Sequence, residues 1–251
     1  MSDGELVPSD RAFLTAKWRD LIMLNYEVDP ALLLPHVPPG TQLDTWSDRT
    51  FVSLVGFLFL DTRILGVPIP FHCNFEEVNL RFYVRREAQG EVRRGVVFIR
   101  EVVPRFAIAA VARAFYNENY VALRMSHTME SGDNGRTVEY GWKAKGAQNR
   151  MSLTTCGEPF LPAADSEEQF ITEHYWGYAR QRDGGCVEYR VEHPAWRVWQ
   201  AKSGGFEGDM RLYYVNELAS VLSRHPNSAF LAEGSAVKVY RGKRIDGSDA
   251  G

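Results

Sequence analysis

The stretch that decides the fold is FEEVNLRFYV, residues 75–84, followed after a short turn by GVVFIREVVP, residues 95–104. Successive side chains of an extended strand point to opposite faces, so Glu77, Asn79 and Arg81 share one face, with an aromatic residue on either side. Ionised side chains are rarely buried without a partner, because desolvation is costly. These residues therefore either form a polar wall inside a cavity or lie on a solvated outer face, and the sequence leaves both interpretations open.

Around this stretch the chain reads as strands with a few helices between them. Apolar, β-branched and alternating segments predict strands over residues 16–28, 50–62, 74–86, 93–103, 120–127, 137–145, 150–155, 187–193, 196–202 and 230–240. The segments 187–193 and 196–202 are expected to form a hairpin over Pro194. Helices are expected over residues 31–34, 106–115, 166–181 and 212–223. The order favours a mostly β, largely antiparallel α+β domain, and the chain has no glycine-rich nucleotide-binding motif.

Composition narrows the classes of partner. With 251 residues, 45% of them hydrophobic, the chain is expected to form one domain over residues 1–251, with loose termini at 1–11 and 245–251. A net charge of −3 gives no basic field for nucleic acid. No apolar run approaches the roughly 18 residues that span a bilayer, and the N-terminus has no signal core. We therefore expect a cytoplasmic protein with no membrane partner; the oligomeric state, a homo-oligomer included, stays open.

Cysteine and histidine spacing gives no sign of a bound metal or cofactor. The three cysteines, Cys73, Cys156 and Cys186, are far apart, which argues against a disulfide framework or a thiolate zinc site. The histidines show no ligand spacing, and His174 and His193 are expected to be structural. We expect no cofactor.

Several segments along the chain resemble one known family, the YqjF-like proteins, or domain of unknown function 2071. The matching segments are residues 24–30, 51–57, 77–81, 94–98, 173–178, 191–194 and 230–235. The family is usually grouped with acetoacetate decarboxylase-like proteins. The resemblance implies a closed, mostly antiparallel β-sheet, shaped like a cone or barrel, around a small cavity.

The resemblance does not extend to the chemistry of the decarboxylase. That enzyme forms a Schiff base on a lysine whose pKa a neighbouring lysine lowers. The matching stretch here, around Arg113, carries no lysine, because none occurs between Lys17 and Lys143. The glutamate of the family's strand motif matches Glu77, which implies at most a role in the cavity. Schiff-base chemistry is therefore not expected.

The candidate site residues follow from these patterns. We expect Glu77, Glu101 and Glu118 to supply general acids or bases, since desolvation raises the pKa of a buried carboxyl group. Binding of a small carboxylate or carbonyl compound is expected from Asn79, Arg100, Arg113, Asn117 and Tyr120. The alternative is a non-catalytic or structural protein in which these charges neutralise one another.

Overall fold

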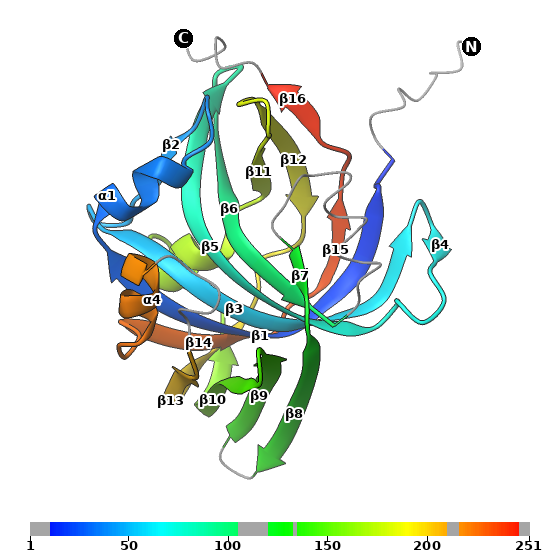
Figure 1. The fold of residues 1–251 in the computed structure, drawn as a ribbon, viewed down its shortest axis with the longest axis vertical. Coiled ribbons are helices and arrows are strands. Elements are labelled where there is room, and N and C mark those ends of the chain that lie inside the picture. The colour runs from blue at the N-terminus through cyan, green and yellow to red at the C-terminus, as the bar shows by residue number, and fades with distance from the viewer. Residues whose placement is uncertain (1–10, 105–119, 133–134, 210–215, 246–251) are drawn as a thin grey trace.

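The computed structural model describes residues 11–104, 120–132, 135–209 and 216–245 (Figure 1). Its strands form one extended sheet with a few short helices. The strands are β1 (Leu14–Val28), β2 (Gln42–Leu43), β3 (Thr50–Ile64), β4 (Val67–Pro68), β5 (Phe75–Ala88), β6 (Glu91–Val103), β7 (Tyr120–Ala122), β8 (Arg124–Gly132), β9 (Gly135–Ala144), β10 (Ala147–Phe160), β11 (Trp176–Arg180), β12 (Cys186–Glu192), β13 (Val198–Glu207), β14 (Ser228–Ala232), β15 (Ala236–Val239) and β16 (Lys243–Ile245). The helices are α1 (Pro30–Leu33), the 3-10 turn η2 (Leu34–His36), α3 (Glu167–Thr172) and α4 (Asn216–Leu222).

Seven strands close into a ring, in the order β1, β3, β5, β6, β11, β12 and β15. The pairing of β1 with β3 on one side and with β15 on the other completes the circle. All neighbours in this ring are antiparallel except β6 and β11, which are parallel. The prediction of a mostly β fold with a closed, mainly antiparallel sheet is confirmed.

The strand β1 belongs to both parts of the sheet. Residues 14–17 pair with β15, and residues 21–25 pair with β14, from which β13, β10, β9 and β8 follow (Figure 1). The strand expected over 230–240 is therefore two strands, separated at Gly234. Gly234 has φ +72°, and a Cβ there would lie 2.1 Å from the carbonyl oxygen of Trp18, so only glycine allows the chain to turn at this position.

Two hydrophobic cores lie on opposite faces of the same strands. On β1, β3 and β5, side chains such as Ile22, Leu54 and Leu80 point away from the ring and pack against Tyr140 and Met151 of the second part of the sheet. The alternate residues point into the ring and form a core rich in aromatic side chains, among them Phe51, Phe57, Phe59, Phe75 and Tyr83. Both faces are apolar, which explains why these strands read as nearly continuous hydrophobic runs.

The helix expected over 166–181 is wrong beyond its first turns. Ser166 caps α3 as predicted, because its hydroxyl accepts a hydrogen bond from the backbone N–H of Gln169, but the helix ends at Thr172. The following residues form β11, which pairs with β6 and β12. Gly95 and Gly177 allow the close approach: a Cβ on Gly95 would lie 2.7 Å from the carbonyl oxygen of Trp176, and one on Gly177 2.1 Å from the Tyr189 ring. Sheet pairing overrides the four-residue spacing of the apolar side chains.

Three other expectations have different outcomes. The hairpin over Pro194 is wrong, because β12 pairs with β11, β15 and β16, whereas β13 pairs with β10 and β14. The helix expected over 212–223 is confirmed from Asn216 to Leu222. The one expected over 106–115 lies outside the described residues. Among the residues described, no helix has the length and apolar content to cross a membrane.

Candidate functional site

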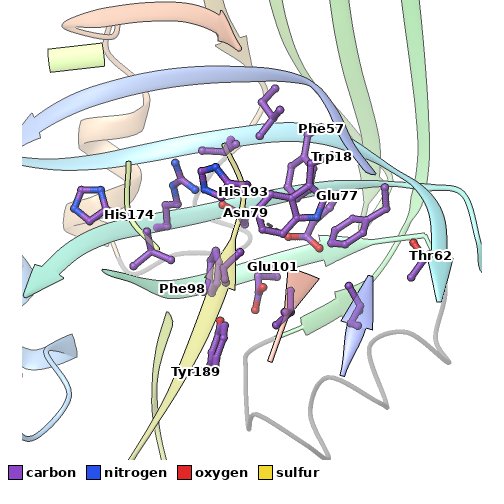
Figure 2. A pocket seen from close by; sticks show the side chains of 18 of the residues that line it. Trp18, Phe57, Thr62, Glu77, Asn79, Phe98, Glu101, His174, Tyr189 and His193 are labelled. Atoms are coloured by element: carbon purple, nitrogen blue, oxygen red, sulfur yellow. Dashed lines mark hydrogen bonds between the residues drawn. The ribbon is translucent and has the colours of Figure 1, made fainter. Parts of the chain in front are cut away.

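A cavity of about 250 Å³ lies inside the ring, and each of the seven ring strands contributes to its wall (Figure 2). Most of the lining is aromatic or aliphatic, with a small set of polar side chains among it. Ligand sites commonly have this character, because the apolar wall excludes water and a few polar groups fix the orientation. The polar lining residues are Thr62, His72, Glu77, Asn79, Arg81, Glu101, Tyr120, Thr172, His174, Tyr189 and His193.

Four of the predicted residues meet on one wall: Glu77, Asn79, Glu101 and Tyr120, which we call the acidic cluster. Asn79 lies opposite Glu101 across β5 and β6, and Glu101 lies opposite Tyr120 across β6 and β7. The Asn79 amide donates a hydrogen bond of 2.9 Å to Glu77 Oε1, and the Tyr120 hydroxyl donates one of 3.4 Å to Glu77 Oε2. Glu77 and Glu101 are 2% and 1% exposed, so the alternative of a solvated outer face is wrong for this wall.

Arg81 extends this wall and is the one arginine among the described residues that line the cavity. Its side chain is buried, its Nη2 donates a hydrogen bond of 3.1 Å to the carbonyl oxygen of Ile171, and its guanidinium carbon lies 5.7 Å from the centre of the Tyr83 ring. Within the described part of the chain no carboxylate lies within ion-pair distance of Arg81, and its Nε has no hydrogen-bond partner. A buried guanidinium in this state has a strong preference for an anionic ligand.

A histidine held by an aspartate also borders the cavity. His174 Nε2 lies 3.2 Å from Asp44 Oδ2, and the same oxygen accepts a 2.7 Å hydrogen bond from Arg94 Nε. Burial raises the pKa of Asp44, but the hydrogen bonds from His174 and Arg94 lower it overall. Burial lowers the pKa of His174 to about 4, and the positive charges of Arg94 and Arg81 act in the same direction, so the ring is neutral near pH 7.

A second histidine closes another part of the wall. His193 stacks on Trp196 with ring centres 4.1 Å apart and an angle of 19°, and its Nδ1 lies 2.9 Å from the carbonyl oxygen of Pro194. Burial lowers the pKa of His193 to about 4. This fits the predicted structural role, although the ring also lines the cavity. In Figure 2, His174 and Thr62 lie at opposite ends of the view, with Glu77, Asn79 and Glu101 between them.

The remaining predicted site residues have two outcomes. Arg100 is not among the lining residues: it lies opposite Leu80, on the face of β6 that points away from the cavity, so the structure does not bring it to the predicted site. A bulge between Leu80 and Arg81 sets this register and places Phe98 opposite Arg81. Arg113, Asn117 and Glu118 lie outside the described residues, and their roles stay predictions.

Sequence reasoning missed Asp44, expected His174 to be structural, and placed Arg81 on the possible polar wall without giving it a role in binding. Arg81 was recognisable from its alternation with Glu77 and Asn79, but its missing partner is a property of the folded chain. Asp44 and His174 are 130 residues apart, and only the closure of the ring brings them together. No local pattern in the sequence signals such a pair.

The cavity wall offers no lysine amine. All six lysines belong to the described residues, all are exposed, and none lines the cavity. A Schiff base between a lysine of this wall and a bound carbonyl compound is therefore excluded by geometry. Over the described ranges, no group of three histidine, cysteine or acidic side chains is arranged to hold a metal ion.

Comparison with known proteins identifies the family of this chain. The model of DUF2071, described as an uncharacterized conserved protein, matches residues 15–236. The chain belongs to the DUF2071 family. It is 27% identical over 201 residues to the uncharacterized protein YqjF of Bacillus subtilis, covering 78% of this chain and 79% of that protein. The resemblance that the sequence motifs indicated is therefore confirmed.

Solved structures show that this DUF2071 protein has the acetoacetate decarboxylase-like fold. The acetoacetate decarboxylase of Legionella pneumophila superposes with a TM-score of 0.65 at 14% identity, covering 98% of this chain and 92% of that one. The enduracididine biosynthesis enzyme MppR complexed with pyruvate gives 0.66 at 12% identity, with 94% and 91% covered. An acetoacetate decarboxylase-like enzyme from Sphingomonas wittichii gives 0.64 at 14% identity, with 96% and 98% covered. At these identities the likeness shows the fold.

Proposed function

We propose that this protein binds a small organic carboxylate in the cavity of the ring, with Arg81 as the group that receives the anion. The observation that carries the proposal is the buried guanidinium of Arg81, for which the described residues supply no carboxylate. Water is a poor counter-ion in an apolar cavity, so a ligand carboxylate is the natural partner for this charge. The aromatic and aliphatic wall accommodates the rest of a small molecule.

The acidic cluster gives this ligand a neighbour capable of proton transfer. Glu77 is buried on the same strand face as Arg81, separated from it only by Asn79, and Asn79 and Tyr120 fix both of its oxygens. A carboxyl group so positioned exchanges protons with the carbon next to a ligand carbonyl without covalent attachment. Structural neighbours with this fold include a decarboxylase and an enzyme crystallised with pyruvate, which agrees with chemistry on small carbonyl acids.

A second candidate is a binding protein without turnover. The hydrogen bonds to both oxygens of Glu77 favour it, because a carboxylate held by two donors is a weaker base. The two candidates share the binding step and differ in whether Glu77 moves a proton.

Binding is tested by thermal unfolding with a panel of small carboxylic acids, each compared with its methyl ester. A ligand that binds only the folded chain raises the melting temperature. We expect acids, but not esters, to stabilise the wild-type protein, and the affinity to fall about 10- to 100-fold in Arg81→Met, the loss of one charge-assisted contact. The exposed Arg63→Met is the control and leaves binding unchanged. Equal binding to wild type and Arg81→Met would sink the proposal.

Proton transfer is tested separately with the acids that bind. Incubation of a bound keto acid in D₂O, followed by proton NMR, detects exchange at the carbon next to the carbonyl. We expect exchange above the uncatalysed rate in the wild-type protein and its loss in Glu77→Gln, with the dissociation constant retained. Binding without exchange in the wild type would select the non-catalytic candidate.

A further inference from the structure

Some hydrogen-bond acceptors on the described part of the cavity wall lack a donor, and two of them lie close to Arg81. His174 Nδ1 and Asn79 Oδ1 are both fully buried, and neither has a hydrogen-bond partner in the described parts of the chain. Buried acceptors in proteins are satisfied in the great majority of cases, because an unpaired one has lost its hydrogen bonds to water without replacing them. A ligand that satisfies these two atoms has a donor to offer. Two buried donors of the same wall, Trp18 Nε1 and Arg81 Nε, also have no partner among the described residues, and they suit the acceptor oxygens of a carboxylate.

Geometry fixes the role of each atom. Asp44 is ion-paired to Arg94, so its carboxylate only accepts hydrogen bonds, and the His174 nitrogen beside it, Nε2, must carry the proton. The other nitrogen, Nδ1, then presents a lone pair. In the same way the Asn79 amide nitrogen donates to Glu77, which leaves Oδ1 as the free acceptor.

The two acceptors lie on either side of Arg81. Asn79 precedes Arg81 on the same face of β5, two residues or about 7 Å away along the strand. His174 packs on the ring of Tyr83, the next residue of that face, with ring centres 4.7 Å apart. The guanidinium, which needs an anion, is thus flanked by groups that need a donor.

We propose that the ligand of this cavity is a hydroxycarboxylic acid, whose carboxylate binds Arg81 and whose hydroxyl donates a hydrogen bond to His174 Nδ1. The inference rests on the carboxylate binding at Arg81 in the proposed function and narrows it. A hydroxy acid has no keto carbonyl, so a preference for it favours the candidate that binds without proton exchange at Glu77. A keto acid places a second acceptor against the Nδ1 lone pair, which is repulsive, whereas the matching hydroxy acid supplies the missing donor. The neutral ring supports this arrangement, since burial lowers the pKa of His174 to about 4 and keeps Nδ1 free of a proton near pH 7.

The experiment compares matched ligand pairs on the intact wild-type chain: lactate with pyruvate, and 2-hydroxybutyrate with 2-oxobutyrate, by isothermal titration calorimetry at pH 7.5. Each pair keeps the carboxylate and the carbon skeleton and changes only the hydroxyl. We expect the hydroxy acid to bind at least about tenfold more tightly, the discrimination that one satisfied buried acceptor gives. Equal affinities, or tighter binding of the keto acid, would overturn the inference.

The result separates the two proposals. If hydroxy and keto acids bind alike, and both lose affinity in Arg81→Met, the carboxylate site stands and the hydroxyl contact at His174 is wrong. If no acid of either kind binds, the proposed function itself fails.

A variant assigns the preference to His174. His174→Phe keeps an aromatic ring against Phe170 and Tyr83 and removes the Nδ1 acceptor. We expect hydroxy acids to weaken to the affinity of their keto partners while the keto acids change little. A preference that persists in His174→Phe would place the hydroxyl contact elsewhere. The wild-type ligand pairs test the inference even if this variant folds poorly.

Discussion

Two positions on β5 treat buried arginine in opposite ways. Arg81 lies at the cavity with no carboxylate within ion-pair distance among the described residues. Five residues further on, Arg86 is equally buried and pairs with Glu188 at 3.3 Å. Glu188 also binds Arg93 at 2.7 Å and accepts a 3.1 Å hydrogen bond from the Tyr178 hydroxyl, forming what we call the paired cluster: Arg86, Arg93, Tyr178 and Glu188.

The difference separates a structural use of charge from a functional one. In the paired cluster every charge has a protein partner, and burial together with the Glu188 carboxylate raises the pKa of Tyr178 well above its ordinary value, so its hydroxyl stays a donor. At Arg81 burial costs the hydration of the charge, and the part of the chain that the structure describes supplies no counter-ion. Charges that contribute only to stability are expected to be paired within the protein, as in the paired cluster. Charges that bind a ligand are expected to lack a protein counter-ion, as at Arg81.

The largest expected effect is at the paired cluster. Glu188→Gln removes the carboxylate that the buried Arg86 and the partly buried Arg93 share, so the free energy of unfolding should fall by about 3–5 kcal/mol. Urea denaturation followed by circular dichroism measures it.

A matched control lies on the same strand, β12. Glu192 also contacts two cations, Lys238 and Arg190, and the Tyr240 hydroxyl, but it is exposed. Glu192→Gln should therefore cost much less than Glu188→Gln, because exposed ion pairs contribute little. Similar losses in both variants would show that burial does not distinguish the two clusters.

The sequence predicts only part of this difference between Arg81 and Arg86. Alternation along 75–84 correctly predicts that Glu77, Asn79 and Arg81 share a face, and strand composition predicts most of the ring. It does not show which arginine is paired, because Glu188 is 102 residues from Arg86 and 95 from Arg93. The register of β6 cannot be predicted from the sequence either. The bulge beside Arg81 determines that Glu101, and not Arg100, faces the cavity.

Long-range pairing also explains why the helix predicted over residues 166–181 is wrong. Residues 166–181 have a good cap and helical spacing, yet the segment is a short helix followed by a ring strand, and that change places His174 at the junction. Tertiary pairing decided the outcome, as it does when local preferences are weak. The turn that sequence reasoning missed is what positions the side chain with the unpartnered Nδ1.

An intermediate effect is expected in the pH dependence of stability. Because burial lowers the pKa of His174 from 6.5 to about 4, the unfolded chain binds a proton in this window that the folded chain does not. Stability from this group is complete above about pH 6.5 and is lost as the pH falls toward 4, at up to about 1.4 kcal/mol per pH unit. Urea unfolding at pH 7, 6 and 5 should show a shallower decline in His174→Phe than in the wild type.

The exposed His225→Gln controls for loss of a histidine as such and should leave the slope unchanged. His193, whose pKa burial also lowers to about 4, keeps some decline in the His174→Phe variant. An identical slope in wild type and His174→Phe would mean that the ring is hydrated and titrates normally, which would weaken its place in the cavity.

The smallest expected effect is at Arg81 itself, and it is the most diagnostic. Arg81→Met removes a buried charge that has no carboxylate partner among the described residues, which relieves desolvation, and loses one hydrogen bond to the carbonyl oxygen of Ile171. These contributions oppose each other, so without ligand the free energy of unfolding should stay within about 1 kcal/mol of the wild type.

Arg86→Met is the same substitution five residues along β5. It leaves the Glu188 carboxylate with Arg93 as its remaining ion-pair partner and should destabilise the chain clearly. Adding a binding carboxylic acid should then widen the difference at Arg81, because the ligand stabilises only the wild type. Equal destabilisation by the two substitutions would mean that Arg81 has a counter-ion in solution, and that both positions on β5 use arginine in the same way.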